Sequence, residues 1–363
     1  MSEETIENLE DLIKLHVGSN KKILGSATSL LTAPGDNYGG ILLKVDITLE
    51  NEENDTQEEI NAVAKLIPGS EFMQQVLNTQ VTCKKEIAFY EEIVPMLQEF
   101  QKEQGVDEII DTFPKFYGAR INLNGSDTVD RNAVLMLENL VPSEKILPYL
   151  VDQFPHGGET PRLIQLLILE FLEDCEECQT LMPTLRQIIE RPRHEKPEER
   201  KEPFLTIAHG DMWVNNIMVK FEKGEPVGSK FVDFQNIAFR SPAVDLFLFL
   251  WSSVQISVLE ENLDDLIKFY HENLIENLSQ LKCDCEPFSL ESLLEELNIS
   301  AKYGIPHALF MITFVVFGKK GGFSIDQTSS KMPDFGTKED ITSEAKEKVL
   351  FMLTQCNERG WLY

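Results

Sequence analysis

Apolar and polar residues alternate along residues 41–48, where every second side chain from Ile41 to Ile47 is apolar. This period of two predicts a β-strand with one buried face. Residues 1–22 and 81–101 have apolar side chains at helical spacing, so each stretch predicts a helix. Further strands are predicted by short apolar runs at residues 23–33, 60–67, 116–121, 133–137 and 204–208. The run of Asn, Glu and Asp at residues 51–59 predicts a solvated connection.

Beyond residue 140 the apolar pattern is mostly helical. The helical stretches are residues 162–191, 247–269, 290–297, 305–317 and 343–356, the last of which we expect at the surface. The pattern therefore predicts an α+β fold of two lobes, for which 363 residues are long enough. Residues 1–140 would form an N-terminal lobe with an antiparallel sheet and a helix, and residues 141–363 a mostly helical C-terminal lobe.

Charge and composition narrow the possible partners. The chain has 61 acidic and 33 basic residues, a formal net charge of −28. Nucleic acids and anionic membranes would repel such a protein, so we exclude them as partners. The acidic N-terminus has no secretory or transit signal, and no apolar run approaches the roughly 20 residues that cross a bilayer. We therefore expect a cytoplasmic monomer with reduced cysteines.

A polar cluster follows the short strand that ends at Ala208. It consists of His209, Asp211 two residues later and Asn216 five residues after that, and Asp233 ends another apolar run. This spacing is typical of a phosphoryl-transfer site, in which one carboxylate orients the substrate hydroxyl while an amide and a second carboxylate hold Mg²⁺ on the phosphates of ATP. We assign the first role to Asp211 and the metal to Asn216 and Asp233. We expect His209 to order the loop by hydrogen bonding.

Lys65 lies inside the apolar run at residues 60–67, where a buried ammonium needs a partner. We predict that Lys65 clamps the α- and β-phosphates of ATP and that Glu86, early in the next helix, is its partner. Two alternatives stay open. Lys65 would be solvated if its strand were at the edge of the sheet, and Glu91 or Glu92 would be the partner if the helix were rotated.

Two further stretches are candidates for binding the nucleotide. The turn at residues 34–40 offers backbone N–H groups to phosphates, although the same residues also suit an ordinary hairpin. The groups concerned belong to Asn37, Tyr38 and Gly39. After the strand at residues 133–137, the backbone of Glu138 and Leu140 would form the hinge that meets adenine, and we place the lobe boundary there.

Together these motifs resemble the ecdysteroid-kinase-like (CHK-kinase-like) family, which is allied to aminoglycoside phosphotransferases and choline kinases. The resemblance covers roughly residues 25–320 and rests on His209-Gly-Asp-Met-Trp-Val-Asn-Asn216, Val232-Asp-Phe-Gln235 and Ser241-Pro-Ala-Val-Asp-Leu246. It implies a protein-kinase-like fold and ATP-dependent phosphorylation of a small-molecule hydroxyl, with ecdysteroids as the family's best-known substrates. It also implies that Asp245 bonds the backbone of the catalytic loop. Gly40 stands where the family often has Ser.

Two other hypotheses about the function stay open, one with a different acceptor alcohol and one without catalysis. A choline- or sugar-type kinase would keep the chemistry and change the acceptor, while a pseudokinase would only bind a ligand. The pseudokinase is disfavoured because no member of the expected set is missing. That set consists of Lys65, Glu86, Asp211, Asn216 and Asp233. Trp251, Phe310 and Phe314 lie in apolar helices and would either line the acceptor site or belong to the core.

Overall fold

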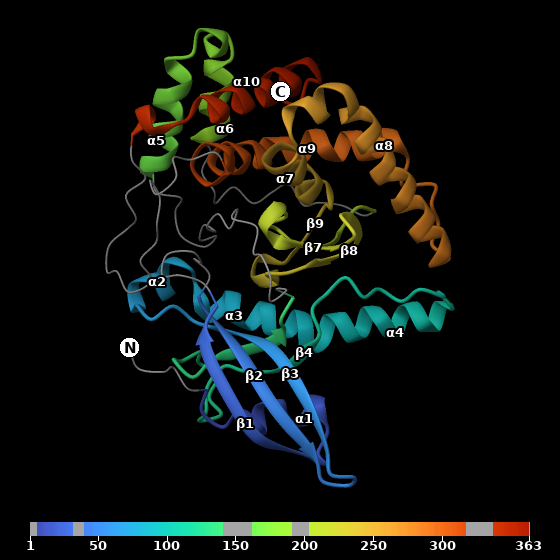
Figure 1. The fold of residues 1–363 in the computed structure, drawn as a ribbon. Helices are drawn as coiled ribbons and strands as arrows, with labels where there is room; N and C mark the ends of the chain where they lie inside the picture. The colour runs from blue at the N-terminus through green and yellow to red at the C-terminus, as the bar shows by residue number, and fades with distance from the viewer. Residues whose placement is uncertain (1–5, 32–39, 141–161, 191–202, 317–336, 363) are drawn as a thin grey trace.

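Five antiparallel strands form the sheet of the N-terminal lobe in the computed structural model, in the order β1–β2–β3–β5–β4 (Figure 1). The strands are β1 (Lys21–Leu30), β2 (Ile41–Asn51), β3 (Thr56–Leu66), β4 (Phe116–Arg120) and β5 (Val134–Glu138). The structure describes residues 6–31, 40–140, 162–190, 203–316 and 337–362. Lys65 thus lies on β3, an inner strand, paired with Leu42 on one side and Leu135 on the other.

The prediction of a solvated connection at residues 51–59 is wrong for most of that stretch. β2 continues to Asn51 and β3 already begins at Thr56, with Glu50 paired to Gln57. The polar side chains at this end of the hairpin are compatible with strands because they are solvent-exposed or half-buried. Only a tight turn remains, in which Asp55 has a positive φ of 53°.

The long helix predicted at residues 81–101 forms, but with a change of winding in its middle. α3 (Thr79–Ala88) passes into a π-helical turn, η1 (Phe89–Ile93), and then into α4 (Val94–Gln104). Pro95 has no backbone N–H to continue the α-helical pattern, and the N–H of Val94 bonds the carbonyl of Phe89 instead. A short helix, α2 (Glu71–Val76), precedes α3.

Helix α1 (Leu9–Val17) packs against β4. This contact requires a glycine at position 118 of the strand. Gly118 has a φ of 145°, and a Cβ there would lie 2.2 Å from the carbonyl oxygen of Leu12. The predicted N-terminal helix is therefore present, although it ends at Val17 and β1 follows.

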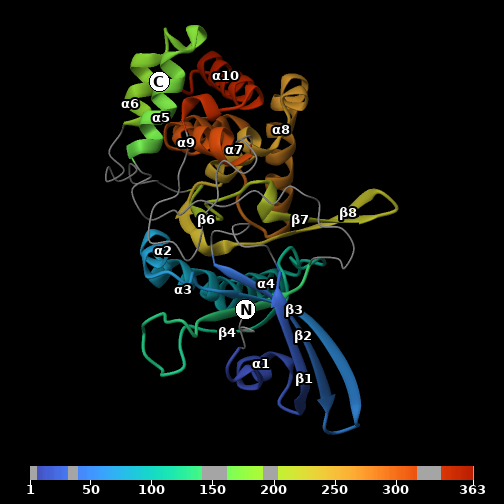
Figure 2. The same ribbon diagram turned by 60° about the vertical axis from the view of Figure 1, so that its left-hand side comes forward.

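The C-terminal lobe is mostly helical, and two small strand pairs lie beside it. Its helices are α5 (Arg162–Glu173), α6 (Met182–Ile189), α7 (Ala243–Ser253), α8 (Ile256–Gln280), α9 (Leu290–Phe310) and α10 (Ser343–Glu358), with a π-helical segment η5 (Met311–Val316) after α9. The strand pairs are β6 (Thr206–Ala208) with β9 (Ala238–Arg240), and β7 (Ile217–Glu222) with β8 (Glu225–Phe231). Figures 1 and 2 show both pairs between the helical lobe and the sheet.

The expectation that the helix at residues 343–356 lies at the surface is wrong for its apolar face. Its apolar face is buried in the core of the C-terminal lobe, through Ala345, Val349, Met352, Leu353 and Cys356. Trp251 and Phe310 belong to the same core, which is the plainer of their two interpretations. The side chain of Phe314 lies outside the described residues. In the described part of the chain, no helix combines the length and apolarity that a bilayer crossing requires.

Candidate active site

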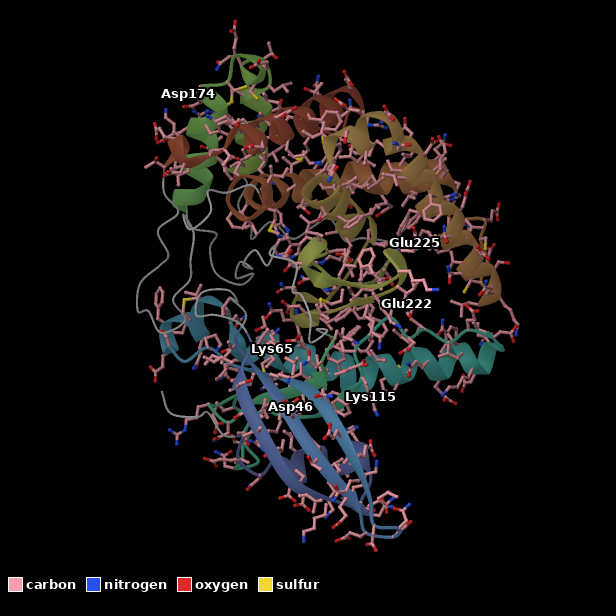
Figure 3. The ribbon with its side chains drawn as sticks, viewed as in Figure 1. Asp46, Lys65, Lys115, Asp174, Glu222 and Glu225 are labelled. Carbon is pink, nitrogen blue, oxygen red and sulfur yellow. The ribbon has the colours of Figure 1, made fainter. Side chains whose placement is uncertain are left out.

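Lys65 joins two carboxylates that are far apart in the sequence. Its Nζ lies 2.7 Å from Oε2 of Glu86 on α3 and 2.8 Å from Oδ1 of Asp233, which follows β8. All three side chains are largely buried, with exposed fractions of 15%, 5% and 14%. Figure 3 shows Lys65 at the end of the sheet that faces the helical lobe. Glu91 and Glu92, the alternative partners, are both solvent-exposed.

The electrostatics of this group are those of one cation between two anions. Burial opposes the charge of Lys65, but the attraction of Asp233 and Glu86 outweighs it and raises the pKa of Lys65 above its ordinary value. Burial also raises the pKa of Glu86; Lys65 opposes this shift, while the neighbouring charge of Asp233 adds to it. One buried ammonium is therefore shared by two largely buried carboxylates.

A left-handed backbone and two side-chain contacts fix the segment that carries Asp233. Asp233 itself has a left-handed backbone, with φ 69° and ψ 60°, which Asp tolerates better than most residues. The side-chain amide of Gln235 donates to Oδ2 of Asp233 over 3.3 Å, and the ring of Phe234 stacks on Phe89 with centroids 3.7 Å apart. Because Phe89 directly follows α3, this stacking ties Asp233 to the helix that carries Glu86.

Asp245, in the first turn of α7, holds the loop that contains Asp211. Its two carboxylate oxygens accept from the backbone N–H of His209, over 2.7 Å, and of Gly210, over 2.8 Å. Gly210 has a φ of 81°, and a Cβ there would lie 2.5 Å from the carbonyl oxygen of Asn236. Burial raises the pKa of Asp245, although the two N–H bonds act in the opposite direction. This loop requires glycine at position 210.

Both ring nitrogens of His209 contact the backbone. Nε2 lies 2.9 Å from the carbonyl oxygen of Val232, and Nδ1 lies 3.3 Å from the N–H of Asp211. A neutral ring that carries its proton on Nε2 satisfies both contacts, since it donates to the carbonyl and accepts from the amide. His209 is therefore suited to ordering the loop, and it connects the Asp211 segment to the residue before Asp233.

Asn216 and Asp233 have the oxygen donors that Mg²⁺ prefers, an amide and a carboxylate. The Nδ2 of Asn216 donates to the backbone carbonyl of Asp211 over 2.8 Å, and the backbone carbonyl of Asn216 accepts from the N–H of Val232 over 3.0 Å. The described residues contain no group of three or more His, Cys, Asp or Glu side chains that could hold a metal. Mg²⁺ usually keeps several waters and takes only one or two carboxylates from the protein, so the chemistry of Asn216 and Asp233 fits it.

Of the expected hinge residues, Glu138 bonds other parts of the protein through its backbone N–H and its carboxylate. The backbone N–H of Glu138 donates to the carbonyl of Lys115 over 2.8 Å, and its carboxylate lies 3.0 Å from Nζ of Lys230 on β8. That ion pair joins β5 to the β7–β8 pair. It also helps to hold the pKa of Glu138 below its ordinary value, against the opposing effect of burial. Leu140 is half-buried. Residues 34–39 of the predicted phosphate-binding turn lie outside the described residues, and they include Asn37, Tyr38 and Gly39.

Two residues near the site were not assigned a role from the sequence. Gln235 contacts Asp233, as described above. His307, on α9, has its Nε2 3.9 Å from Oδ1 of Asp211. No local motif marks His307, because 96 residues separate it from Asp211 and only the packing of α9 brings the two together.

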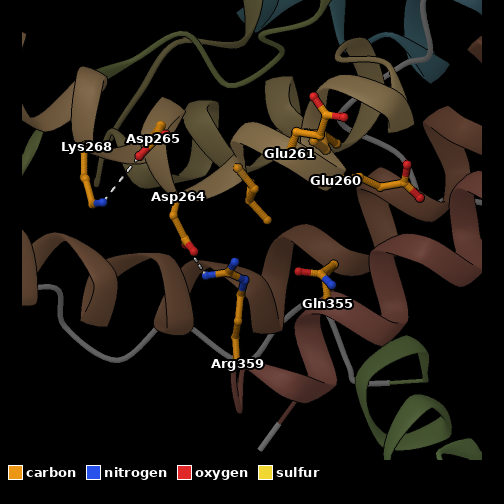
Figure 4. A pocket seen from close by; sticks show the side chains of 9 residues that line it. Glu260, Glu261, Asp264, Asp265, Lys268, Gln355 and Arg359 are labelled. Carbon is orange, nitrogen blue, oxygen red and sulfur yellow. Dashed lines mark hydrogen bonds and ion pairs between the residues drawn. The ribbon is translucent and has the colours of Figure 1, made fainter.

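Two surface hollows do not include Lys65, Asp211 or Asp233. One, of about 310 Å³, lies between α8 and α10 and is lined by Glu260, Glu261, Asp264 and Asp265, with ion pairs from Arg359 to Asp264 and from Lys268 to Asp265 (Figure 4). The other, of about 450 Å³, lies between α1, α4 and β4 and includes His16, Phe116 and Glu138. The second hollow therefore reaches the expected hinge at Glu138.

Comparison with known proteins assigns the chain to a family. A sequence model of the ecdysteroid kinase-like family matches residues 34–146 and 161–283, more than half of the chain. No curated protein sequence matches it. Among solved structures, the GDP and kanamycin complex of APH(2")-IIia is similar over 82% of this chain and 91% of that chain, with 11% identity and a TM-score of 0.31, a level that supports no further conclusion. The family match and the observed sheet and helices confirm the predicted two-lobed, protein-kinase-like α+β fold.

Proposed function

The chain belongs to the ecdysteroid kinase-like family of small-molecule kinases, and we propose that it transfers the γ-phosphoryl group of ATP to a hydroxyl of an apolar alcohol such as an ecdysteroid. The observation that carries the proposal is the position of Lys65 between Glu86 and Asp233, at 2.7 and 2.8 Å, next to the buried Asp211 loop. Buried charged groups held close together, with perturbed pKa values, are typical of functional sites.

The nucleotide would lie between the sheet and the Asp211 loop. Lys65 would contact the α- and β-phosphates, and Glu86 would hold its ammonium in place. The turn that contains Asn37, Tyr38 and Gly39 would cover the phosphates with backbone N–H groups. Because the N–H of Glu138 is used by Lys115, adenine would meet the carbonyl of Glu138 and the backbone of Leu140.

Mg²⁺, when bound, would offset the negative charge of the phosphates. Asn216 and Asp233 would hold it through their side-chain oxygens. The protein contributes the positions of these two ligands: the Asp211 carbonyl orients the amide of Asn216, and Gln235 orients the carboxylate of Asp233.

Asp211 would orient the acceptor. The oxygen of the alcohol forms a bond to the γ-phosphorus while the bond from that phosphorus to the bridging oxygen of ADP breaks. The hydroxyl proton goes to the carboxylate of Asp211. Phosphoryl transfer needs positioning more than a strong base, so a carboxylate held by a rigid loop suffices. His209 and Asp245 supply that rigidity.

The test is a transfer assay with Mg²⁺-ATP and a panel of alcohols comprising an ecdysteroid, choline and glucose. We expect a phosphorylated ecdysteroid and equimolar ADP from the wild-type chain. Asp211→Asn, which keeps the shape of the side chain, should reduce transfer by at least about 100-fold without changing ATP binding. Transfer to choline or glucose alone would reassign the acceptor class. ATP binding without transfer to any alcohol would favour a pseudokinase.

A further inference from the structure

The packing of α9 on α7 brings His307 close to Asp211. At Gly304 the two helices touch so closely that a Cβ would lie 2.6 Å from Cδ1 of Phe247. α7 also carries Asp245, which holds the backbone of the Asp211 loop. His307 follows Gly304 by about one helical turn, and its Nε2 lies 3.9 Å from Oδ1 of Asp211. α9 lies beyond residue 283, where the family match ends.

The distance between His307 and Asp211 suits a third polar atom. Nε2 and Oδ1 are 3.9 Å apart, which is too far for a hydrogen bond between them. An alcohol oxygen placed about 2.8 Å from each of these atoms would form an Nε2···O···Oδ1 angle of about 90°. This angle is within the range that a tetrahedral oxygen can adopt in its hydrogen bonds. The exposed fractions of the two side chains are 21% for His307 and 3% for Asp211, and the Nε2 atom of His307 is itself buried.

We propose that His307 binds the acceptor alcohol through a hydrogen bond from Nε2–H to the oxygen that attacks the γ-phosphorus. The inference rests on the proposed function and names the group that completes its acceptor site. The alcohol would donate its proton to Asp211 and accept from His307, so its remaining lone pair points to the phosphorus. No bond to His307 forms or breaks. The ligand is any small molecule with a hydroxyl that can enter between α9 and the Asp211 loop.

The experiment compares His307→Ala and His307→Gln with wild type, using the panel alcohol on which wild type is most active. His307→Ala should raise the KM for that alcohol about tenfold, the cost of one lost hydrogen bond to a polar group. The KM for ATP should change less than twofold. His307→Gln retains an N–H donor and should recover part of the loss, which a role in packing alone would not give.

His271→Gln is the matched control, because this histidine lies on α8 with Nε2 2.7 Å from the carbonyl of Phe288, in the same lobe. It should leave both KM values unchanged, and thermal unfolding should show that all variants fold. An unchanged alcohol KM in His307→Ala would overturn the inference while the proposed function stands. An equal rise in both KM values, or no recovery in His307→Gln, would overturn it too. If wild type phosphorylates no alcohol of the panel, the proposed function fails and the inference fails with it.

Discussion

The ammonium of Lys65 lies 2.8 Å from the carboxylate of Asp233, although 168 residues separate them. Lys65 belongs to an inner strand of the sheet, while Asp233 belongs to the segment between β8 and β9. The pair therefore joins the two halves of the fold at the point where the phosphates of ATP would lie. Glu86 shares the same ammonium, so the single positive charge of Lys65 faces two carboxylates.

Asp233→Asn removes one of these carboxylates with little change of shape. We expect transfer to fall by about 100-fold or more, because a neutral amide holds Mg²⁺ less well and no longer fixes Lys65 through an ion pair. Raising the Mg²⁺ concentration should recover part of the activity. Initial rates over a series of Mg²⁺ concentrations measure both effects.

Glu222→Gln provides the comparison, since Glu222 is an exposed carboxylate on β7 that pairs with Lys220 over 2.7 Å. This variant should have wild-type rates at every Mg²⁺ concentration. Wild-type activity of Asp233→Asn at low Mg²⁺ would contradict the assignment of Asp233 to the metal.

Gly210→Ala tests the close approach within the Asp211 loop. Its left-handed backbone costs any other residue about 1 kcal/mol, and the new Cβ would also lie 2.5 Å from the carbonyl of Asn236. We expect loss of transfer together with a loss of several kcal/mol in the free energy of unfolding. Gly224→Ala carries the same backbone penalty, at φ 89°, but has nothing within 4 Å of its Cβ. Equal destabilisation of the two variants in urea unfolding would refute the role of the Asn236 contact.

Asp245→Asn tests the anchoring of the same loop from α7. An amide offers only one acceptor oxygen to the two N–H groups of His209 and Gly210, so one buried donor loses its partner. We expect a loss of about 1–3 kcal/mol in the free energy of unfolding and a lower kcat. The reference is Asp264→Asn, which breaks an exposed ion pair with Arg359 and should cost less than about 1 kcal/mol. If Asp245→Asn is destabilised but its kcat is unchanged, Asp245 contributes to folding and not to catalysis.

The fold could be predicted because its strands and helices have strong local patterns. The alternation in residues 41–48 and the helical spacing after Val81 depend only on neighbouring residues. Two predictions were wrong because polar side chains were taken as a sign of a solvated connection or of a surface helix. Residues 56–59 are polar and still form a strand, and α10 was expected at the surface although its apolar face is buried. The α+β, two-lobed architecture is confirmed.

Less of the candidate site than of the fold could be predicted from the sequence. The structure brings Lys65, Glu86 and Asp233 into contact, while their catalytic roles and the lobe boundary at residue 140 stay predictions. The position of His307 could not be predicted, because it depends on how closely α9 approaches α7 at Gly304. Packing between helices that are distant in the sequence has no local pattern to reveal it.

Lys348 provides a test of stability against pH in the C-terminal lobe. Its side chain is 1% exposed, and its Nζ donates to the carbonyl of Val254. Burial lowers the pKa of Lys348 from 10.5 to about 8. Below pH 8 the folded chain bears the full cost of the buried charge, about 3 kcal/mol. Between pH 8 and 10.5 the unfolded chain binds more protons than the folded one, so this group's contribution makes stability rise with pH.

Lys348→Met removes the titrating group, so its stability should lack this rise. Urea unfolding at pH 7, 8, 9 and 10 should show wild type gaining about 2–3 kcal/mol relative to the variant across that range. Lys65 does not produce the same effect, because its pKa is raised and its stabilisation is lost only above pH 10.5. Lys268→Met, at an exposed lysine 3.4 Å from Asp265, should follow wild type at each pH. A difference between wild type and Lys348→Met that stays constant from pH 7 to 10 would show that the buried ammonium is not destabilised.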